Sequence, residues 1–369
     1  VRIEARRRWS STISQTESEI FIFNYSEPNN PDEKDKNQEN PYLALKHFGP
    51  NHAKYYFGRT KEIGELSTKV NENNFVAVTG TSGAGKSSLV LAGIVPELYN
   101  KNNNWKFTYF KLYEDNDPFR ALAKALLPLC SGIKLFDDED LSEINCAKLS
   151  ILLNDKQEIF GEILTKIQHN NSLLIIADQF EEVLSYKSFS DTESSDDYRF
   201  HFLDTLVKGI KSASENRSAK DHSNRIVWIS TIRDTTIGNQ LALYTNHIGR
   251  DPYILGPLDK NQFKAVIKDP LSSKGTITEE AFKALEKTFI KDDQVKNLPL
   301  LQYTLSALWN TRNQNNEINL DTIGKEGVEG ILKSKANEMY QKSLTEKKEE
   351  VFKKLFLDLI SIDPKNGST

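Results

Sequence analysis

A glycine-rich loop that ends in a lysine and a serine is the clearest candidate for chemistry in this sequence. It has the pattern G-x-x-x-x-G-K-S, and its residues, with the serine that follows, are Gly80, Thr81, Ser82, Gly83, Ala84, Gly85, Lys86, Ser87 and Ser88. Converging backbone N–H groups before a helix bind phosphate well, and glycines let the backbone approach it closely. Lys86 is expected to reach the β- and γ-phosphates, and the Ser87 hydroxyl to coordinate Mg²⁺. The loop therefore predicts a binding site for a nucleotide and Mg²⁺.

The second motif is acidic and follows a continuous apolar run at residues 173–177. A fully apolar run of this length is typical of a central parallel strand that is buried on both faces. Asp178 would then lie at the carboxyl end of the strand, where α/β sheets bind ligands, and we expect it to hold Mg²⁺ directly or through water. Glu181 or Glu182 is expected to polarise the water that attacks the γ-phosphate when the nucleotide is hydrolysed. The alternatives are a helix N-cap for Asp178 and a favourable helix-dipole position for the two glutamates.

Two arginines are further candidates for contacts with phosphate. Arg233 follows a central strand predicted at residues 225–232. A cation there is suited to sense the γ-phosphate and to stabilise charge in the transition state, and the alternative is a surface ion pair with Asp234. Arg250 precedes the last predicted strand, which is where an arginine finger lies in ring ATPases.

Three more residues are candidates for holding the nucleotide. Gly58 and Arg59 precede a predicted helix, and their backbone could approach an adenine; an ordinary helix start is the alternative. Pro299 begins a helix that could close on the base or the β-phosphate. A proline in the first turn of an ordinary helix explains the same residue equally well.

Strands and helices alternate between residues 60 and 257. The predicted strands are 75–79, 105–112, 173–178, 225–232 and 253–255. The predicted helices between them are 60–72, 85–99, 118–129, one that ends near 168, and 196–213. Parallel strands joined by helical crossovers form a sheet that helices cover on both faces. The expected fold class is α/β, a three-layer P-loop NTPase domain with a parallel sheet of about five strands.

The pattern becomes all helical after Pro257. The predicted helices are 260–268, 278–291, 299–310, 330–343 and 346–360. We therefore predict four parts. They are an N-terminal segment with a polar linker at 1–40, the NTPase domain at 41–257, a helical lid at 258–328 and the beginning of a further subdomain at 329–369.

Composition limits the classes of partner. Of the 369 residues, 38% are hydrophobic and 27% charged, as in globular proteins, and the net charge of −4 provides no general attraction to nucleic acid. No apolar run has membrane-spanning length, so we expect no membrane partner. Cys130 and Cys146 are expected to be reduced and structural. The sequence begins at Val1, without a Met and without a signal-peptide pattern, so we expect a fragment of a longer chain and a cytoplasmic protein.

Several motifs in order resemble the STAND class of P-loop NTPases, in particular its bacterial "novel STAND NTPase" branch. Besides the glycine-rich loop, they are Pro41-Tyr-Leu-Ala-Leu-Lys, Phe57-Gly-Arg59, Asp178-Gln-Phe-Glu-Glu182, Ser230-Thr-Ile-Arg233 and Leu298-Pro-Leu-Leu-Gln-Tyr-Thr-Leu-Ser-Ala-Leu-Trp309. The resemblance extends from residue 41 to about 345. Thr60 departs from the family, which usually has an acidic residue there. By the same resemblance, residues 329–369 would begin a winged-helix subdomain that is cut short at Thr369.

The resemblance implies an ATPase that acts as a signalling switch. Members hold ADP between the α/β domain and the lid at rest, exchange it for ATP when a ligand is sensed, and self-associate. An effector usually precedes the NTPase and a sensor follows it, and bacterial members often serve antiphage defence. Slow ATP hydrolysis is expected. Two alternatives stay open: a conventional AAA+-like ring motor in which Arg250 acts in trans, and a small-molecule kinase.

Overall fold

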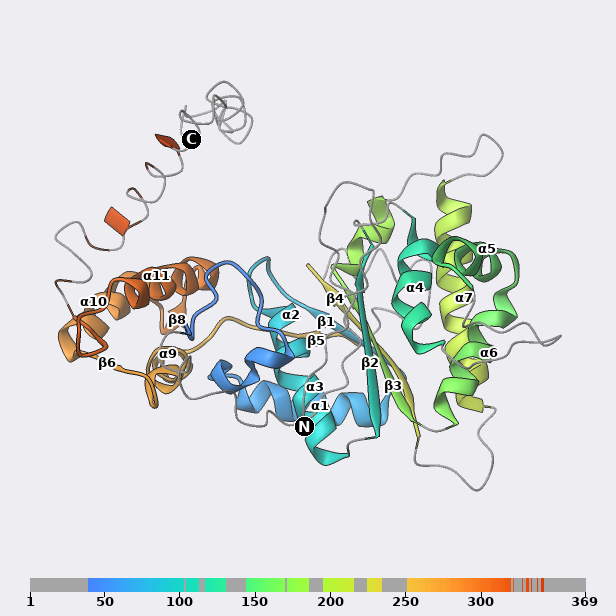
Figure 1. The fold of residues 1–369 in the computed structure, drawn as a ribbon, viewed down its shortest axis with the longest axis horizontal. Helices are drawn as coiled ribbons and strands as arrows, with labels where there is room; N and C mark the ends of the chain where they lie inside the picture. The colour runs from blue at the N-terminus through green and yellow to red at the C-terminus, as the bar shows by residue number, and fades with distance from the viewer. Residues whose placement is uncertain are drawn as a thin grey trace. The chain divides into compact units, whose positions relative to one another are not determined.

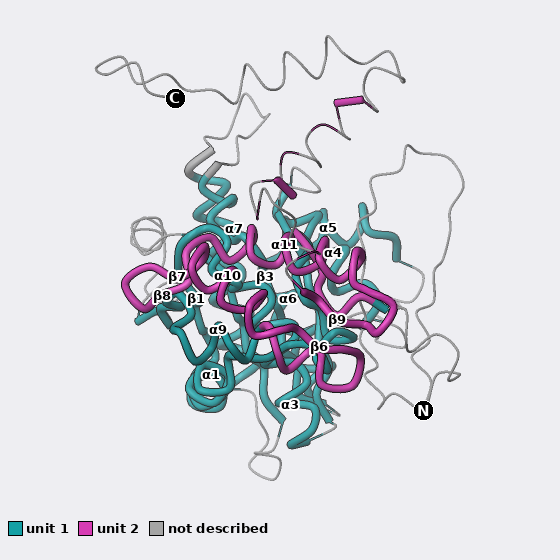
Figure 2. The backbone as a smooth tube through the Cα atoms, turned by 90° about the vertical axis from the view of Figure 1, so that its left-hand side faces the viewer, with its two compact units in different colours: residues 1–39, 46–266 teal, residues 40–45, 267–369 magenta. Residues whose placement is uncertain are grey.

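A computed structural model describes most of the chain between residues 39 and 319. The described ranges are 39–102, 104–112, 117–130, 144–169, 171–185, 195–215, 224–233 and 251–319, with single residues between 321 and 341 (Figure 1). The chain forms two compact units, the first of residues 1–39 and 46–266 and the second of residues 40–45 and 267–369 (Figure 2). Most of the predicted linker and most of the predicted final subdomain lie outside the described residues.

A five-stranded parallel sheet forms the centre of the first unit. Its strands are β1 (Phe75–Thr79), β2 (Trp105–Lys111), β3 (Ser172–Asp178), β4 (Ile226–Ile232) and β5 (Tyr253–Ile254). They lie in the order β2-β3-β4-β1-β5. All residues of β3 and β4 are buried, as expected for central strands, whereas β2 alternates at an edge. The predicted parallel α/β sheet is confirmed.

Helices cover both faces of this sheet (Figure 1). One face carries α1 (Thr60–Glu72) and a continuous helix made of α2 (Lys86–Ser88), the wider η2 (Leu89–Ile94) and α3 (Val95–Lys101). The other face carries α4 (Pro118–Leu126), α5 (Cys146–Asp155), α6 (Gln157–Gln168) and α7 (Ser195–Glu215). The short turns η1 (Pro50–Tyr55), η3 (Leu127–Leu129) and η6 (Phe180–Ser185) join these elements.

Alternating strand residues supply two separate cores, one under each helical layer. Val76 and Val78 of β1 pack in the core with α1 and η2, whereas Ala77 packs in the core with α4 to α7. This period of two follows from the pleat of a strand. The three predicted layers are therefore built from opposite faces of the same strands.

The second unit is mainly helical but also contains two small sheets. It includes the end of α9 (Lys260–Lys268), then η7 (Asp269–Leu271), α10 (Glu279–Phe289) and α11 (Leu298–Asn310). The sheets are the parallel pair β6 (Thr276–Ile277) and β9 (Glu317–Ile318), and the antiparallel pair β7 (Ile290–Lys291) and β8 (Gln294–Val295). The prediction of an all-helical region was thus wrong over these residues. Asp292 and Asp293 have φ values of 53° and 56°, which suit a two-residue hairpin turn between β7 and β8.

Residues 40–45 belong to the second unit through hydrogen bonds. The Asn40 side-chain amide donates to the carbonyl oxygen and Oγ of Ser306, at 3.2 and 3.0 Å. The buried Tyr42 hydroxyl donates to the Ile267 carbonyl at 2.6 Å. These contacts connect a segment before the first strand to helices more than two hundred residues later in the chain.

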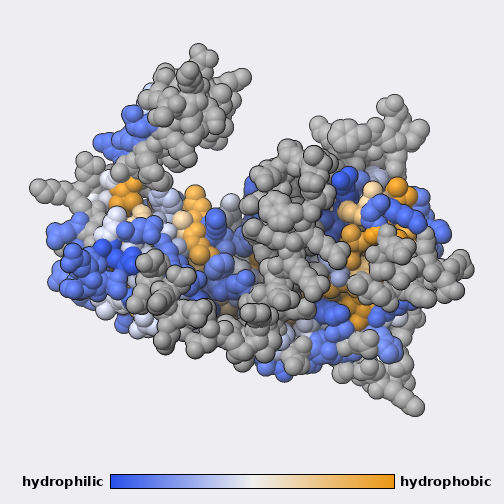
Figure 3. Space-filling view, viewed as in Figure 1, coloured by the Kyte–Doolittle hydropathy of each residue, from blue (hydrophilic) through white to orange (hydrophobic). Residues whose placement is uncertain are grey.

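Hydrophilic side chains cover most of the visible described surface, and apolar ones gather over α4 to α7 (Figure 3). Ile151 of α5 and Phe200 of α7 are large exposed apolar residues. No helix among the described residues has the length and apolar character needed to cross a membrane.

Candidate functional site

The glycine-rich loop lies between β1 and α2 and is tightly held. Gly80 has a φ of 156°, and a Cβ at this position would lie 2.7 Å from the Leu255 carbonyl oxygen, so only glycine fits without rearrangement. The Lys86 ammonium donates to the carbonyl oxygens of Gly80 and Thr81, at 2.8 and 2.9 Å. The lysine therefore lies over the loop that the pattern predicted to bind phosphate.

Asp178 accepts hydrogen bonds from hydroxyls on three other segments. Ser87 Oγ, at the start of α2, donates to Asp178 Oδ1 at 2.6 Å, and Thr231 Oγ1 of β4 donates to the same oxygen at 2.5 Å. The Tyr109 hydroxyl of β2 donates to Asp178 Oδ2 at 2.9 Å. Because Asp178 is only 2% exposed, these donors are what satisfies its buried carboxylate. Ser87 and Asp178, the two predicted magnesium ligands, thus lie in direct contact.

Glu181 and Arg233 approach each other beside this cluster. Arg233 Nε lies 3.7 Å from Glu181 Oε1, with the side chains 57% and 11% exposed respectively. Burial raises the pKa of Glu181, although backbone N–H groups and the charges of Lys86 and Arg233 oppose that rise. Burial also lowers the pKa of Lys86, against the carboxylates of Glu181 and Asp178. Cations and carboxylates therefore share one partly buried site.

The turn after β3 directs Glu181 toward this site. Gln179 has a φ of 54°, which is uncommon for a residue other than glycine, and its N–H donates to Thr231 Oγ1 at 3.0 Å. The Glu181 Oε2 atom is buried and has no hydrogen-bond partner among the described residues. Glu182 is partly buried and forms no ion pair within the described part of the chain. The geometry therefore distinguishes two glutamates that the sequence pattern left equal.

The other predicted site residues have different surroundings. The Ser88 Oγ accepts a hydrogen bond from the Phe48 N–H at 3.1 Å. Gly58 and Arg59 precede α1, and the Arg59 guanidinium donates hydrogen bonds to Glu62 and to the Gly256 carbonyl. Pro299 lies in the first turn of α11, in the second unit. Asp234 and Arg250 lie outside the described residues.

Tyr109 and Thr231 are site residues that sequence reasoning did not assign. Thr231 lies within the motif that ends in Arg233, so its place at the end of a central strand was a usable signal. Tyr109 offered a weaker signal, since it lies within β2, far from every motif in the sequence. Its contact with Asp178 depends on β2 pairing with β3, which only the strand order reveals.

Comparison with solved structures gives several matches. The Aeropyrum pernix ORC2 protein, in its ADPNP–ADP complexes, has a TM-score of 0.50 at 12% identity, over 72% of this chain and 66% of that one. The ADP form of that protein gives 0.45 at 13% identity, over 69% and 63%. A Walker-type ATPase of Pyrococcus abyssi gives 0.46 at 12% identity, over 82% and 81%. The chain spans just under two thirds of the Aeropyrum protein, and the first likeness shows a shared fold.

Sequence comparison identifies the family. No curated protein sequence matches the chain. The family model described as Novel STAND NTPase 1 matches residues 41–369, which is most of the chain and includes every residue of the site. The resemblance inferred from the motifs is confirmed, and the chain belongs to the Novel STAND NTPase 1 family.

Proposed function

We propose that this chain is a molecular switch that binds ATP or ADP with Mg²⁺ and hydrolyses ATP slowly. The observation that carries the proposal is the contact of Ser87 Oγ with Asp178 Oδ1, at 2.6 Å, beside Lys86 and the glycine-rich loop. A hydroxyl and a carboxylate are the hard oxygen ligands that Mg²⁺ prefers. The residues therefore fit the cation, which would neutralise charge on the β- and γ-phosphates when bound.

The residues of the loop would hold the phosphates. The backbone N–H groups of residues 81–85 precede the helix that begins at Lys86 and suit an anion. Lys86, whose ammonium now donates to two loop carbonyls, can exchange these for phosphate oxygens. Gly58 and Pro299 remain our candidates for contacts with the base.

Glu181 is our candidate for the group that orients the attacking water. Its Oε2 atom is buried and has no hydrogen-bond partner in the described part of the chain, and its pKa is raised. Both features suit a base near the chemistry better than the environment of Glu182 does. Arg233 is our candidate sensor of the γ-phosphate. It is more than half exposed, and its ion pair with Glu181 is long, at 3.7 Å, and therefore weak. Arg233 can thus turn toward a phosphate at small cost.

Family membership supports the wider role that we propose. The switch would couple sensing of a ligand to self-association and to activation of an effector, in bacterial antiphage defence and in the cytoplasm. In this proposal ADP is held at rest, an effector domain precedes the chain and a sensor domain follows it.

Substitution of Lys86 tests the site. Lys86→Ala removes charge-assisted hydrogen bonds worth about 1.5–3 kcal/mol each, and ATP and ADP binding should be lost in calorimetric titration. Lys61→Ala is the matched control, because Lys61 is a highly exposed lysine on the neighbouring helix α1. Unchanged ATP affinity in Lys86→Ala would refute the site.

The nucleotide that co-purifies with the chain tests the switch. We expect mass spectrometry to find ADP, together with slow steady-state turnover. Nucleotide-free protein with fast turnover would instead support a ring motor, and phosphate transfer to an added small-molecule acceptor would support a kinase.

A further inference from the structure

Arg59, which precedes α1, is a buried cation that contacts the glycine-rich loop. Its side chain is 4% exposed. One guanidinium nitrogen, Nη2, donates to the carbonyl oxygen of Ala84 in the loop at 3.3 Å and to that of Gly256 at 2.9 Å. The other, Nη1, donates to Glu62 Oε1 at 2.6 Å. Because a guanidinium is planar and its donors point in fixed directions, these contacts fix the distance between the loop and the segment after β5.

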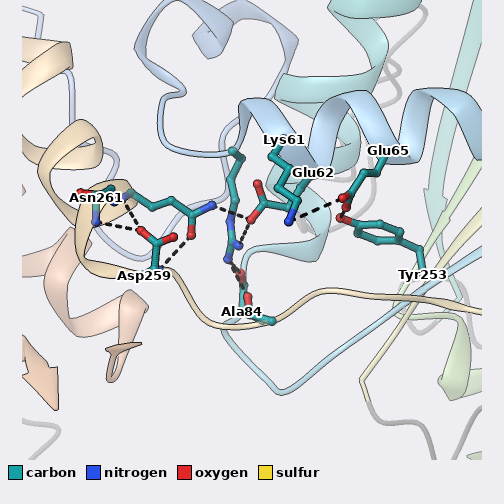
Figure 4. A network of polar contacts seen from close by, with 10 residues as sticks. Lys61, Glu62, Glu65, Ala84, Tyr253, Asp259 and Asn261 are labelled. Atoms are coloured by element: carbon teal, nitrogen blue, oxygen red, sulfur yellow. Dashed lines mark hydrogen bonds and ion pairs between the residues drawn. The ribbon is translucent and has the colours of Figure 1, made fainter. Parts of the chain in front are cut away.

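Glu62 of α1 extends this contact to α9. Its Oε1 atom also accepts a hydrogen bond from the Gln262 side-chain amide at 2.7 Å. The Gln262 Oε1 atom in turn accepts from the Asp259 N–H at 2.9 Å, and Asp259 Oδ1 accepts from the N–H groups of Asn261 and Gln262, both at 2.8 Å. Figure 4 shows Glu62 on α1 directed toward this turn. A continuous chain of hydrogen bonds therefore runs from the loop to the first turn of α9.

Backbone packing supports the same connection independently. Gly58 has a φ of 82°, and a Cβ there would lie 2.8 Å from Val266 Cγ2 and 2.9 Å from the Gln262 carbonyl oxygen. The Leu255 carbonyl oxygen lies against Gly80, and the Leu255 N–H donates to the Thr79 carbonyl at 2.8 Å. The backbone before Arg59 thus packs closely against α9, and the glycine-rich loop packs closely against the segment after β5.

We propose that Arg59 and Glu62 are positioning residues, which hold the Ala84 carbonyl of the loop and connect it through Gln262 to the first turn of α9. The inference rests on the proposed nucleotide site, because ordering of the loop by ADP would then also order the start of α9. The chain passes from the first unit to the second within α9, after Val266. Nucleotide binding at the loop is thereby transmitted to the helix that leads out of the first unit.

The first test removes the guanidinium without leaving a buried charge. Arg59→Met alone leaves the Glu62 carboxylate, 13% exposed, without its cation, which destabilises the fold. The double variant Arg59→Met/Glu62→Gln contains neither charge, so it should melt closer to the wild-type temperature than Arg59→Met does. Its affinity for ADP should still fall roughly tenfold, because the loop has lost its fixed donor. A double variant that binds ADP as tightly as wild type overturns the proposal.

The second test breaks only the connection to α9. Gln262→Ala is compared with Asn261→Ala, a neighbour in the same turn that contributes its backbone N–H. Hydrogen exchange is followed by mass spectrometry in residues 80–88 and 258–266, with and without ADP. ADP should slow exchange in both segments in wild type and Asn261→Ala, but only in residues 80–88 in Gln262→Ala. Retained protection of residues 258–266 in Gln262→Ala overturns the proposed connection.

The two proposals fail in different ways. If wild type binds no ADP in calorimetric titration, the proposed function fails. If wild type binds ADP and protects residues 80–88 but not 258–266, the nucleotide site stands and the role of Gln262 is overturned.

Discussion

Tyr109→Phe is the substitution that most directly tests how the Asp178 carboxylate is held. The change removes one hydroxyl, the donor to Asp178 Oδ2 at 2.9 Å, and keeps the ring, which lies 6.2 Å from the His47 ring. The glycine-rich loop and Lys86 are untouched. Any effect on magnesium must therefore act through the orientation of the carboxylate.

The size of the effect follows from the donors that remain. Loss of a hydrogen-bond partner behind a metal ligand typically costs about 10–100-fold in metal affinity. Asp178 Oδ1 keeps its donors Ser87 and Thr231, and the bond from Tyr109 is only partly buried, so water can replace part of it. We therefore expect the lower end, about a tenfold loss or about 1.4 kcal/mol.

The assay is a Mg²⁺ titration of the affinity for a fluorescent ADP analogue. Without Mg²⁺, wild type and Tyr109→Phe should bind the analogue equally, because in our proposal the loop holds the phosphates. The matched control is Tyr253→Phe, which removes a tyrosine hydroxyl that donates to the Glu65 carboxylate at 2.8 Å. Equal Mg²⁺ dependence in Tyr109→Phe and wild type, or the same loss in Tyr253→Phe, would refute the assigned role of Tyr109.

Glu181→Gln should keep ADP binding and reduce ATP hydrolysis by about 10²–10⁴-fold, and normal turnover would exclude Glu181 as the base. In wild type, hydrolysis should fall with decreasing pH as Glu181 takes up a proton. Because the pKa of Glu181 is raised, this loss should begin above the pH at which an ordinary glutamate protonates, as a pH–rate profile would show. Gly209→Ala should destabilise the chain by about 1–3 kcal/mol, because its Cβ would collide with the Phe160 ring. Gly64→Ala, with open space around the new Cβ, should instead stabilise the chain by about 0.5–1 kcal/mol; opposite shifts in thermal melting would contradict both.

The parts of the fold that could be predicted are those with a strong local signal. β3 contains the apolar run 173–177 and β4 the apolar run 226–229, because both faces of these strands are buried. Asp178 ends β3 and Arg233 follows β4, so polar residues mark both carboxyl ends. The glycine-rich loop is recognisable because close approach to phosphate restricts its residue types. The short pairs β6–β9 and β7–β8 were missed, because two residues of strand carry almost no periodic pattern.

The parts that could not be predicted depend on the order of the strands. β4 lies between β1 and β3, although it comes after both in the sequence. This order brings Thr231 to Asp178 and leaves β2 on the other side of β3, where Tyr109 reaches the second carboxylate oxygen. The target of Arg59 was equally hidden, because its partner at Gly256 is almost two hundred residues away in the chain.

The same strand order also determines how a sensor could work. Arg233 follows β4 and Glu181 follows β3, so the two side chains meet because their strands are neighbours. An ion pair at 3.7 Å with a half-exposed arginine contributes little to stability, about 0–1 kcal/mol. Contact with a γ-phosphate would form stronger charge-assisted bonds, so the exchange of partners is favourable. An arginine held more firmly by Glu181 would respond less to the γ-phosphate, and the weakness of this pair is therefore what a nucleotide sensor requires.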